Sequence, residues 1–146
     1  MPLSKARADE LLTNTLRGTA TPHVWLHTSD PGDDGDQNVC EDPSGDPIVR
    51  KPVSFAAPES ATVTFDTPER RCISTSLLEW EVTTNEIAQG QLLTHISIWS
   101  AASGGQAEFI YSLASAGLNP VSVRSDGVRI PIGELIQSIA IFEGVS

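Results

Sequence analysis

Cysteines, basic residues and long apolar runs are scarce in this 146-residue sequence, and each shortage excludes a class of protein. Its two cysteines, Cys40 and Cys72, cannot build a disulfide-rich scaffold and match no C-x-x-C or zinc-binding spacing. We expect two free thiols, with one disulfide between them as the alternative. No run of about 18 apolar residues occurs, so no membrane-spanning helix is expected. The first residues also lack the apolar core of a signal peptide, so we expect a protein that is made in the cytoplasm and stays soluble or joins a soluble assembly.

Basic residues are fewer than acidic residues. Nine lysines and arginines stand against 19 aspartates and glutamates, which gives a formal net charge of −10. Such a protein repels phosphate backbones and anionic membranes, so neither nucleic acid nor membrane is an expected partner. Much of the acidic excess lies in one segment, Asp30–Asp46, which we call the acidic loop. A solvated acidic surface is the expected role of this loop.

Sequence motifs of common catalytic sites are also missing. No G-x-S-x-G elbow occurs, and spacing identifies no histidine partner for either cysteine. The stretch "ASGGQ" lacks the lysine of a phosphate-binding loop, and "GDDGDQ" would repel phosphate. Glu79 and Glu81 alternate on the outward side of a predicted strand, where no pocket would raise their pKa as a general acid requires. We therefore predict no catalytic residue, no cofactor and no enzymatic activity.

The acidic loop partly matches a calcium-binding loop. The matching residues are Asp30, Asp34, Gly35, Asn38 and Glu41. However, Gly32 occupies the third position, which needs an oxygen ligand, and a strand rather than a helix is predicted to precede the loop. We favour a tight solvated turn, in which Pro31 ends the strand, glycines permit sharp bends and aspartates accept hydrogen bonds from nearby amides. Bound calcium is the alternative.

Three histidines and three tryptophans are the other candidate site residues. His23 and His27 share one face of a predicted strand with Trp25 between them. Zinc would need a third protein ligand, and the spacing nominates none, so no metal site is predicted. The three tryptophans, Trp25, Trp80 and Trp99, could stack against a sugar, but in a small β domain we expect them in the core.

Residues 1–18 have the periodicity of an amphipathic helix, predicted from about Ser4 to Arg17. Its apolar positions recur every three or four residues, and Gly18 follows at the expected end. The apolar stripe is narrow and could pack on its own domain or on another subunit. The candidate assembly residues on this stripe are Leu3, Leu11, Leu12 and Leu16.

Residues 19–146 instead show the two-residue alternation of β-strands. The clearest cases are "LLEWEVT" and the hairpin "LLTHISIWSAASGGQAEFIYSLA", whose turn contains Gly104 and Gly105. Further short strands are predicted around residues 24–26, 49–53, 63–65, 121–123, 128–132 and 139–141. The prediction is an all-β chain: one β-sandwich or barrel-like domain of about 7–8 short antiparallel strands, preceded by the helix.

Four stretches occur in an order that resembles a family of small tailed-bacteriophage virion proteins, labelled phage tail fibre protein or minor tail protein. These stretches are "VWLHTSDPGDDGDQNVCE", "IVRKPVSFAAPES", "LTHISIWSAASGGQAEFIYSLA" and "VRIPIGELIQSI". The family motifs fall on Leu26-His27-Thr28 with Asp30-Pro31-Gly32, on Arg50 with Val53 and Phe55, on Thr94-His95 with Trp99, Ala101, Ser103, Gly104 and Gly105, and on Pro131, Gly133 and Leu135. The segments "PERRCISTS" and "CEDPSGDP" depart from the family pattern.

The resemblance implies a non-enzymatic structural component of the virion, associated with the tail. Its implied partners are other virion proteins and further copies of itself. A decoration protein on the capsid surface, a glycan- or host-receptor-binding module and a hydrolase or metal-dependent enzyme are the alternatives. Burial of the tryptophans separates them: buried rings favour the structural role, whereas two rings exposed together favour glycan binding.

Overall fold

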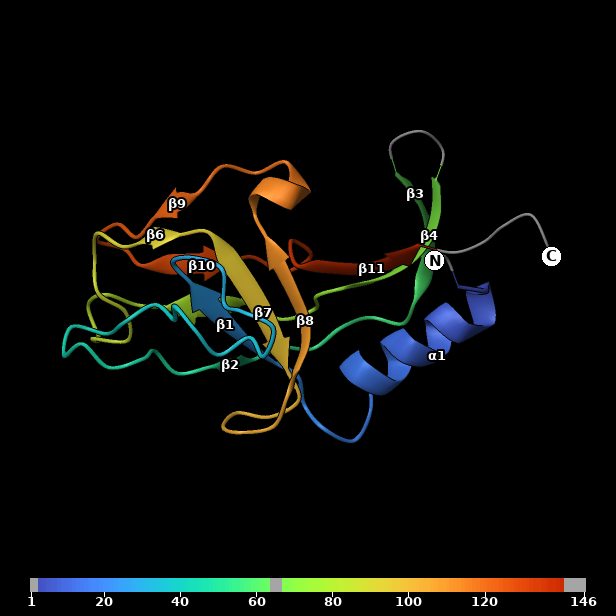
Figure 1. Ribbon diagram of the computed structural model, residues 1–146, viewed down its shortest axis with the longest axis horizontal. Helices are drawn as coiled ribbons and strands as arrows, with labels where there is room; N and C mark the ends of the chain where they lie inside the picture. Colours follow the sequence, from blue (N-terminus) through green and yellow to red (C-terminus); the bar gives the residue numbers. More distant parts are fainter. Residues whose placement is uncertain (1–2, 64–66, 141–146) are drawn as a thin grey trace. The chain divides into compact units, whose positions relative to one another are not determined.

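A computed structural model describes residues 3–63 and 67–140 (Figure 1). The chain divides into two compact units. The first, the helix unit, consists of Met1–Thr21, Val53–Leu77 and Pro131–Ser146, and the second, the hairpin unit, consists of Pro22–Pro52 and Leu78–Ile130. The single-domain organisation, with a helix over residues 1–18 and a sandwich over 19–146, stays a prediction.

The helix unit is built on α1, Lys5–Leu16, which agrees with the predicted helix to within one residue at each end. Ser4 caps its N-terminus because the Ser4 hydroxyl accepts a hydrogen bond from the amide of Arg7 at 3.2 Å. The helix packs against β4 (Thr67–Ile73) and β11 (Ile136–Ala140). These strands form an antiparallel sheet in the order β11–β4–β3, with β3 at Glu59–Val63.

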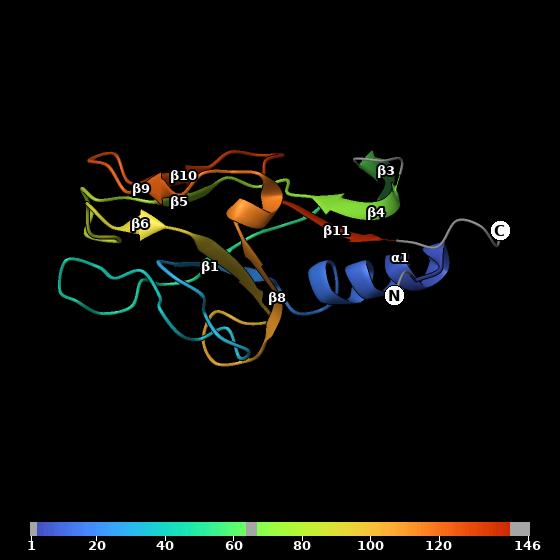
Figure 2. The same ribbon diagram turned by 45° about the horizontal axis from the view of Figure 1, so that its top comes forward.

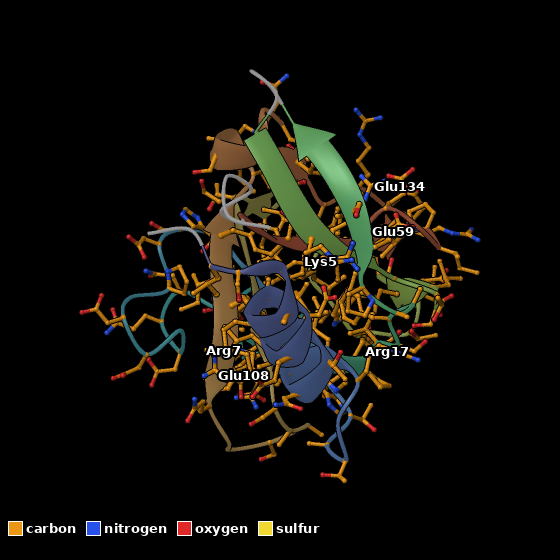
Figure 3. The ribbon with its side chains drawn as sticks, turned by 90° about the vertical axis from the view of Figure 1, so that its right-hand side faces the viewer. Lys5, Arg7, Arg17, Glu59, Glu108 and Glu134 are labelled. Carbon is orange, nitrogen blue, oxygen red and sulfur yellow. The ribbon has the colours of Figure 1, made fainter. Side chains whose placement is uncertain are left out.

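One face of this sheet meets the helix through an ion pair. Nε and Nη2 of Arg70 donate to the two carboxylate oxygens of Asp9 on α1, at 2.6 and 3.2 Å. Arg70 is buried, so the bidentate pairing compensates for the loss of hydration at its guanidinium group. On the opposite sheet face Arg71 pairs with Glu59 at 3.1 Å, and Figure 3 shows Glu59 beside the strand pair β3–β4, above the helix in that view.

The hairpin unit contains a four-stranded antiparallel sheet in the order β2–β1–β7–β8. Its strands are β1 (His23–His27), β2 (Lys51–Pro52), β7 (His95–Trp99) and β8 (Ala107–Ser112). The β7–β8 hairpin was predicted from alternation around Gly104 and Gly105, and it is confirmed. On one sheet face, four aliphatic side chains are buried: Val24, Leu26, Ile96 and Ile98.

Two short strand pairs complete the hairpin unit (Figure 2). Strand β5 (Leu78–Trp80) pairs with β10 (Val128–Ile130), and β6 (Leu92–Leu93) pairs with β9 (Val121–Ser122). A single 3₁₀ turn, η2, covers Ala114–Ala116. No helix in the described part of the chain has the length and apolarity needed to cross a membrane.

The chain is mostly β with one α-helix, as predicted. Its strands form several small antiparallel sheets rather than one closed barrel, so the barrel alternative is wrong, while the sandwich stays a prediction. The described residues hold eleven strands instead of 7–8, partly because several are only two or three residues long.

The largest miss is β4, where the sequence TPERRCI has a proline and three charged residues and no apolar alternation. Conversely, Val82 and Ile132 were predicted in strands but lie in turns. Phe65 and Ile141, both assigned to strands from the sequence, lie outside the described residues.

Candidate functional site

Five side chains form a polar and aromatic cluster on the second face of the β1–β7 sheet, which we call the tryptophan cluster. Its members are Trp25, His27, Arg50, Ser97 and Trp99. The register pairs Trp25 with Ser97 and His23 with Trp99, so alternate residues of the two strands share this face. The rings of Trp25 and Trp99 meet edge to face, with centroids 5.7 Å apart at 85°.

Arg50 covers both rings. Its guanidinium carbon lies 3.8 Å from the Trp99 ring centroid and 4.4 Å from that of Trp25. Nη1 of Arg50 donates to the carbonyls of Ala101 and Gly104, at 3.0 and 2.7 Å. Burial lowers the pKa of Arg50, but an arginine has a pKa so high that it stays charged at neutral pH. Arg50 therefore fastens the β7–β8 turn to the aromatic rings by cation–π contacts and hydrogen bonds.

His27 is fully buried in a hydrogen-bond chain that defines its neutral form. Nδ1 lies 2.9 Å from the carbonyl of Gln37, which only accepts, so Nδ1 carries the proton. Nε2 lies 2.7 Å from the hydroxyl of Ser97, which itself accepts a hydrogen bond from Nε1 of Trp99 at 2.7 Å. Ser97 therefore donates its only proton to His27, and every group in the chain is satisfied with neutral imidazole.

The pKa of His27 is lowered from 6.5 to about 4. Desolvation by burial is the main cause, and the charges of His95 and Arg50 add to it, while the Gln37 hydrogen bond acts in the opposite direction. Protonation would place a second donor against Ser97 and leave the Ser97 hydroxyl proton without its acceptor, Nε2 of His27. The hydrogen bonds of the cluster therefore stabilise the neutral form of His27 over the protonated form.

Acid should therefore weaken the fold through His27. The unfolded chain takes up the proton near pH 6.5 and the folded chain only near pH 4, so this contribution is fully present above pH 6.5 and is lost as pH falls toward 4. The loss amounts to about 3 kcal/mol. Urea unfolding at several pH values, followed by tryptophan fluorescence, measures it.

The matched variant is His27→Gln, which removes the titrating group but leaves the carboxylates that titrate in the same range. Its free energy of unfolding should fall less between pH 7 and pH 4.5 than that of the unmodified protein. Parallel curves for the two proteins would contradict the assignment of this acid sensitivity to His27.

The acidic loop folds over the tryptophan cluster. An added methyl on Gly35 would lie only 2.8 Å from Cβ of Ala107 and 3.4 Å from Cζ2 of Trp99, so the loop backbone rests directly on the sheet. The carbonyl of Gln37 accepts from His27, and the amide of Cys40 bonds to the carbonyl of Leu26 at 2.9 Å. A loop anchored at three points keeps water away from His27 and Ser97.

Aspartates in the loop satisfy local amides, as the turn prediction requires. Oδ1 of Asp30 accepts from the amide of Gly32 at 2.9 Å, and Oδ1 of Asp42 accepts from Ser44 and Asp46 at 2.9 and 3.0 Å. Across residues 3–63 and 67–140, no three or more His, Cys, Asp or Glu side chains are grouped to hold a metal ion. These hydrogen bonds are the ones that a tight turn requires, and bound calcium stays the alternative.

The Ser97–His27 pair has the distance of a nucleophile and its base, but its setting is not catalytic. Both residues are fully buried, and the Ser97 oxygen is also an acceptor for Trp99. A nucleophile must reach its substrate, and its base must be able to take up a proton. Here neither condition is met, so the pair serves to join β1, β7 and the acidic loop.

Tryptophan exposure distinguishes between the sequence-based alternatives. Trp80 is fully buried, Trp99 is 4% exposed and Trp25 is half-buried beneath Arg50. Nε1 of Trp25 donates to Ile48 and that of Trp80 to Val49, at 2.7 and 2.8 Å. The rings are thus mostly inside, as expected for a structural protein, and no pair of bare ring faces is available for a sugar.

Of the four assembly candidates, Leu11, Leu12 and Leu16 lie on helix α1, whereas Leu3 precedes it, so its expected place on the helical stripe is wrong. Leu12 and Leu16 are buried within the chain, so they cannot contact a second subunit while the helix stays packed as it is. Leu3 and Leu11 are half-buried. The helix therefore uses its stripe mainly on its own unit, and an assembly role for these leucines stays a prediction.

Both cysteines are buried, and they are not bonded to each other, as expected. Burial raises the pKa of Cys40 to about 12 and also raises that of Cys72. Neither thiol is therefore poised as a thiolate nucleophile at neutral pH.

Sequence reasoning missed the central role of Arg50 and Ser97. Arg50 appeared only as a position in a predicted strand and in a family motif, and Ser97 as one residue of an alternating strand. The contacts of Arg50 with Trp99 and Gly104 join residues about 50 positions apart, which local spacing cannot reveal. The place of Arg50 in the family motif with Val53 and Phe55 was the only available signal.

Comparison with known families finds a match over most of the chain. A family model described as Podophage GP4 fiber I protein gp80 matches residues 2–138. The match includes the acidic loop, the tryptophan cluster and most of β11, and so spans both units. No curated protein matches the sequence.

Proposed function

Since the chain belongs to the Podophage GP4 fiber I protein gp80 family, we propose that it is a non-enzymatic structural part of a phage tail, of the fibre or minor-tail type. It docks onto other virion proteins through protein–protein contacts. It is made in the host and becomes part of the particle. The observation that carries this proposal is the family match over residues 2–138.

The tryptophan cluster supports the same function. Its polar groups are paired with one another and with the backbone, and the acidic loop covers it. Such an arrangement holds a rigid shape and offers no reacting group to a substrate. A part that is repeated in a particle needs this rigidity, and its net charge of −10 keeps free copies from binding nucleic acid before assembly.

The location can be tested on particles. Antibodies against the purified chain, coupled to gold and viewed by electron microscopy, should label the tails of purified phage. Particles assembled without the gene are the control and should carry no label.

Two outcomes would overturn the proposal. Gold on the head surface would favour a capsid decoration protein, and absence of the chain from purified particles would remove it from the virion. Retention of the isolated chain on a glycan array would favour the receptor-binding alternative, provided that Trp25→Ala abolishes it.

A further inference from the structure

Every open sheet ends in two outer strands, whose free backbone N–H and C=O groups can pair with another chain. Proteins protect such edges with charged side chains, proline or very short strands. An outer strand without this protection is therefore a candidate for pairing with another subunit.

Strand β11 is the unprotected edge of this protein. Among the outer strands of three or more residues in the described part of the chain, the other four each carry a charged residue. These residues are Glu59 in β3, Glu79 in β5, Glu108 in β8 and Arg129 in β10. Strand β2 contains Lys51 and Pro52, and β6 and β9 have two residues each. Only β11, with the sequence IQSIA, is both long and uncharged (Figure 2).

The sequence that contains β11 is uncharged between Glu134 and Glu143. The eight residues from Leu135 to Phe142 include no charge, proline or glycine in the sequence. Ile136 is 41% exposed, and it stands in register with Ile73 of β4, on the sheet face that carries Arg71. On this face of β4, Arg71 is paired with Glu59, and Glu69, in register with Ala140, is the charged residue that remains beside β11.

Gln137, in the same strand, has one polar atom without a partner among the described residues. Its Nε2 folds back to donate to the carbonyl of Ser138 at 3.2 Å, beside it in the strand. Its Oε1 is buried and, within the described residues, has no hydrogen-bond partner. Buried acceptors are rarely left unpaired, so the hydrogen bonding of this side chain is incomplete within the single chain.

A second copy of this chain is the occupant that fits best. With a net charge of −10, two copies repel each other over most of their surfaces, whereas two β11 strands bring no like charges together. Antiparallel pairing of identical strands is also two-fold symmetric, so it closes after two copies. Its centre falls at Ser138, the middle residue of the strand.

We propose that β11 pairs edge to edge and antiparallel with β11 of a second copy, so that the two β11–β4–β3 sheets become continuous. This inference deepens the proposed function and rests on it for its use in the virion. The pairing is measured on the purified chain. The protein can therefore lie in the tail without forming this dimer, and it can form the dimer without lying in the tail.

Light scattering during size-exclusion chromatography tests the pairing. The purified full chain should pass from its monomer mass of 15.6 kDa to twice that mass as concentration rises. Ser138→Lys would place two positive charges together at the centre of the pair and should weaken dimerisation by at least about tenfold.

Ala61→Lys is the matched control. Ala61 lies on the same sheet face as Ser138, since Ala61 and Ser138 stand in register with Glu69 and Arg71 of β4, but on the opposite outer strand, β3. It adds the same charge to the same sheet and should leave the dimer intact. Circular dichroism of each variant checks that helix α1 and its sheet are retained.

A charge exchange gives the decisive measurement. Ser138→Glu, which faces Arg71 within its own chain, should also weaken the dimer, and mixing it with Ser138→Lys should restore a species of twice the monomer mass. A monomer at every concentration, an equal loss with Ala61→Lys, or no restoration in the mixture would each overturn the proposal.

Discussion

Replacing Trp99 with alanine should lower the free energy of unfolding of the hairpin unit by about 4 kcal/mol. Trp99 is 4% exposed, contacts Trp25 edge to face and carries Arg50 over its ring. The substitution leaves a large cavity beneath the acidic loop. It also removes the donor to Ser97 and a ring that holds Arg50.

Urea unfolding followed by tryptophan fluorescence is the suitable measurement, because Trp25 and Trp80 remain as reporters in the same unit. Trp99→Phe is the matched control. It keeps a ring under Arg50 but loses the Nε1 donor, so it should cost about 2 kcal/mol. Equal losses for the two variants would show that the ring contacts with Arg50 and Trp25 contribute little to stability.

Replacing Gly127 with alanine should cost about 4 kcal/mol, for a reason that involves only the backbone. Gly127 has φ +84°, a conformation that favours glycine, and its amide closes the turn on Arg124 at 3.0 Å. An added Cβ would lie 2.1 Å from the carbonyl oxygen of Trp80, on the paired strand β5. The β5–β10 pair would have to separate to admit it.

Gly45→Ala separates the cost of a positive φ from the cost of the steric clash with Trp80. Gly45 has nearly the same φ, +85°, but an added Cβ there would have no atom within 4 Å. It should cost only the conformational strain, about 1 kcal/mol. If the two variants unfolded at the same urea concentration, the close approach of Gly127 to Trp80 would not be a real constraint on the fold.

Local patterns explain which parts of the fold were predictable. Helix α1 follows from a three- and four-residue repeat with Ser4 before it, and the β7–β8 hairpin from alternation around two glycines. In these elements the local pattern and the tertiary packing favour the same structure. Strand β4 was missed because its Arg70 and Arg71 are stabilised by partners elsewhere in the chain, Asp9 and Glu59.

The candidate site was less predictable than the fold. The burial of Trp80 and Trp99 was expected because the domain is a small β domain. The hydrogen bond of Asp30 to a nearby amide was expected from turn chemistry. The chain from Trp99 through Ser97 to His27 was not, because it depends on the β1–β7 register and on the path of the acidic loop. Neither the register of the two strands nor the path of the loop can be predicted from residue spacing.

The helix unit is assembled from the first, middle and last segments of the chain, and this order matters during synthesis. Helix α1 is translated before every segment of the hairpin unit, but β11, against which it packs, comes after residue 135. Until then a nascent chain carries Leu12 and Leu16 without their complete sheet, while every segment of the hairpin unit has already been made. Folding of the helix unit therefore has to wait for β11, whereas folding of the hairpin unit does not.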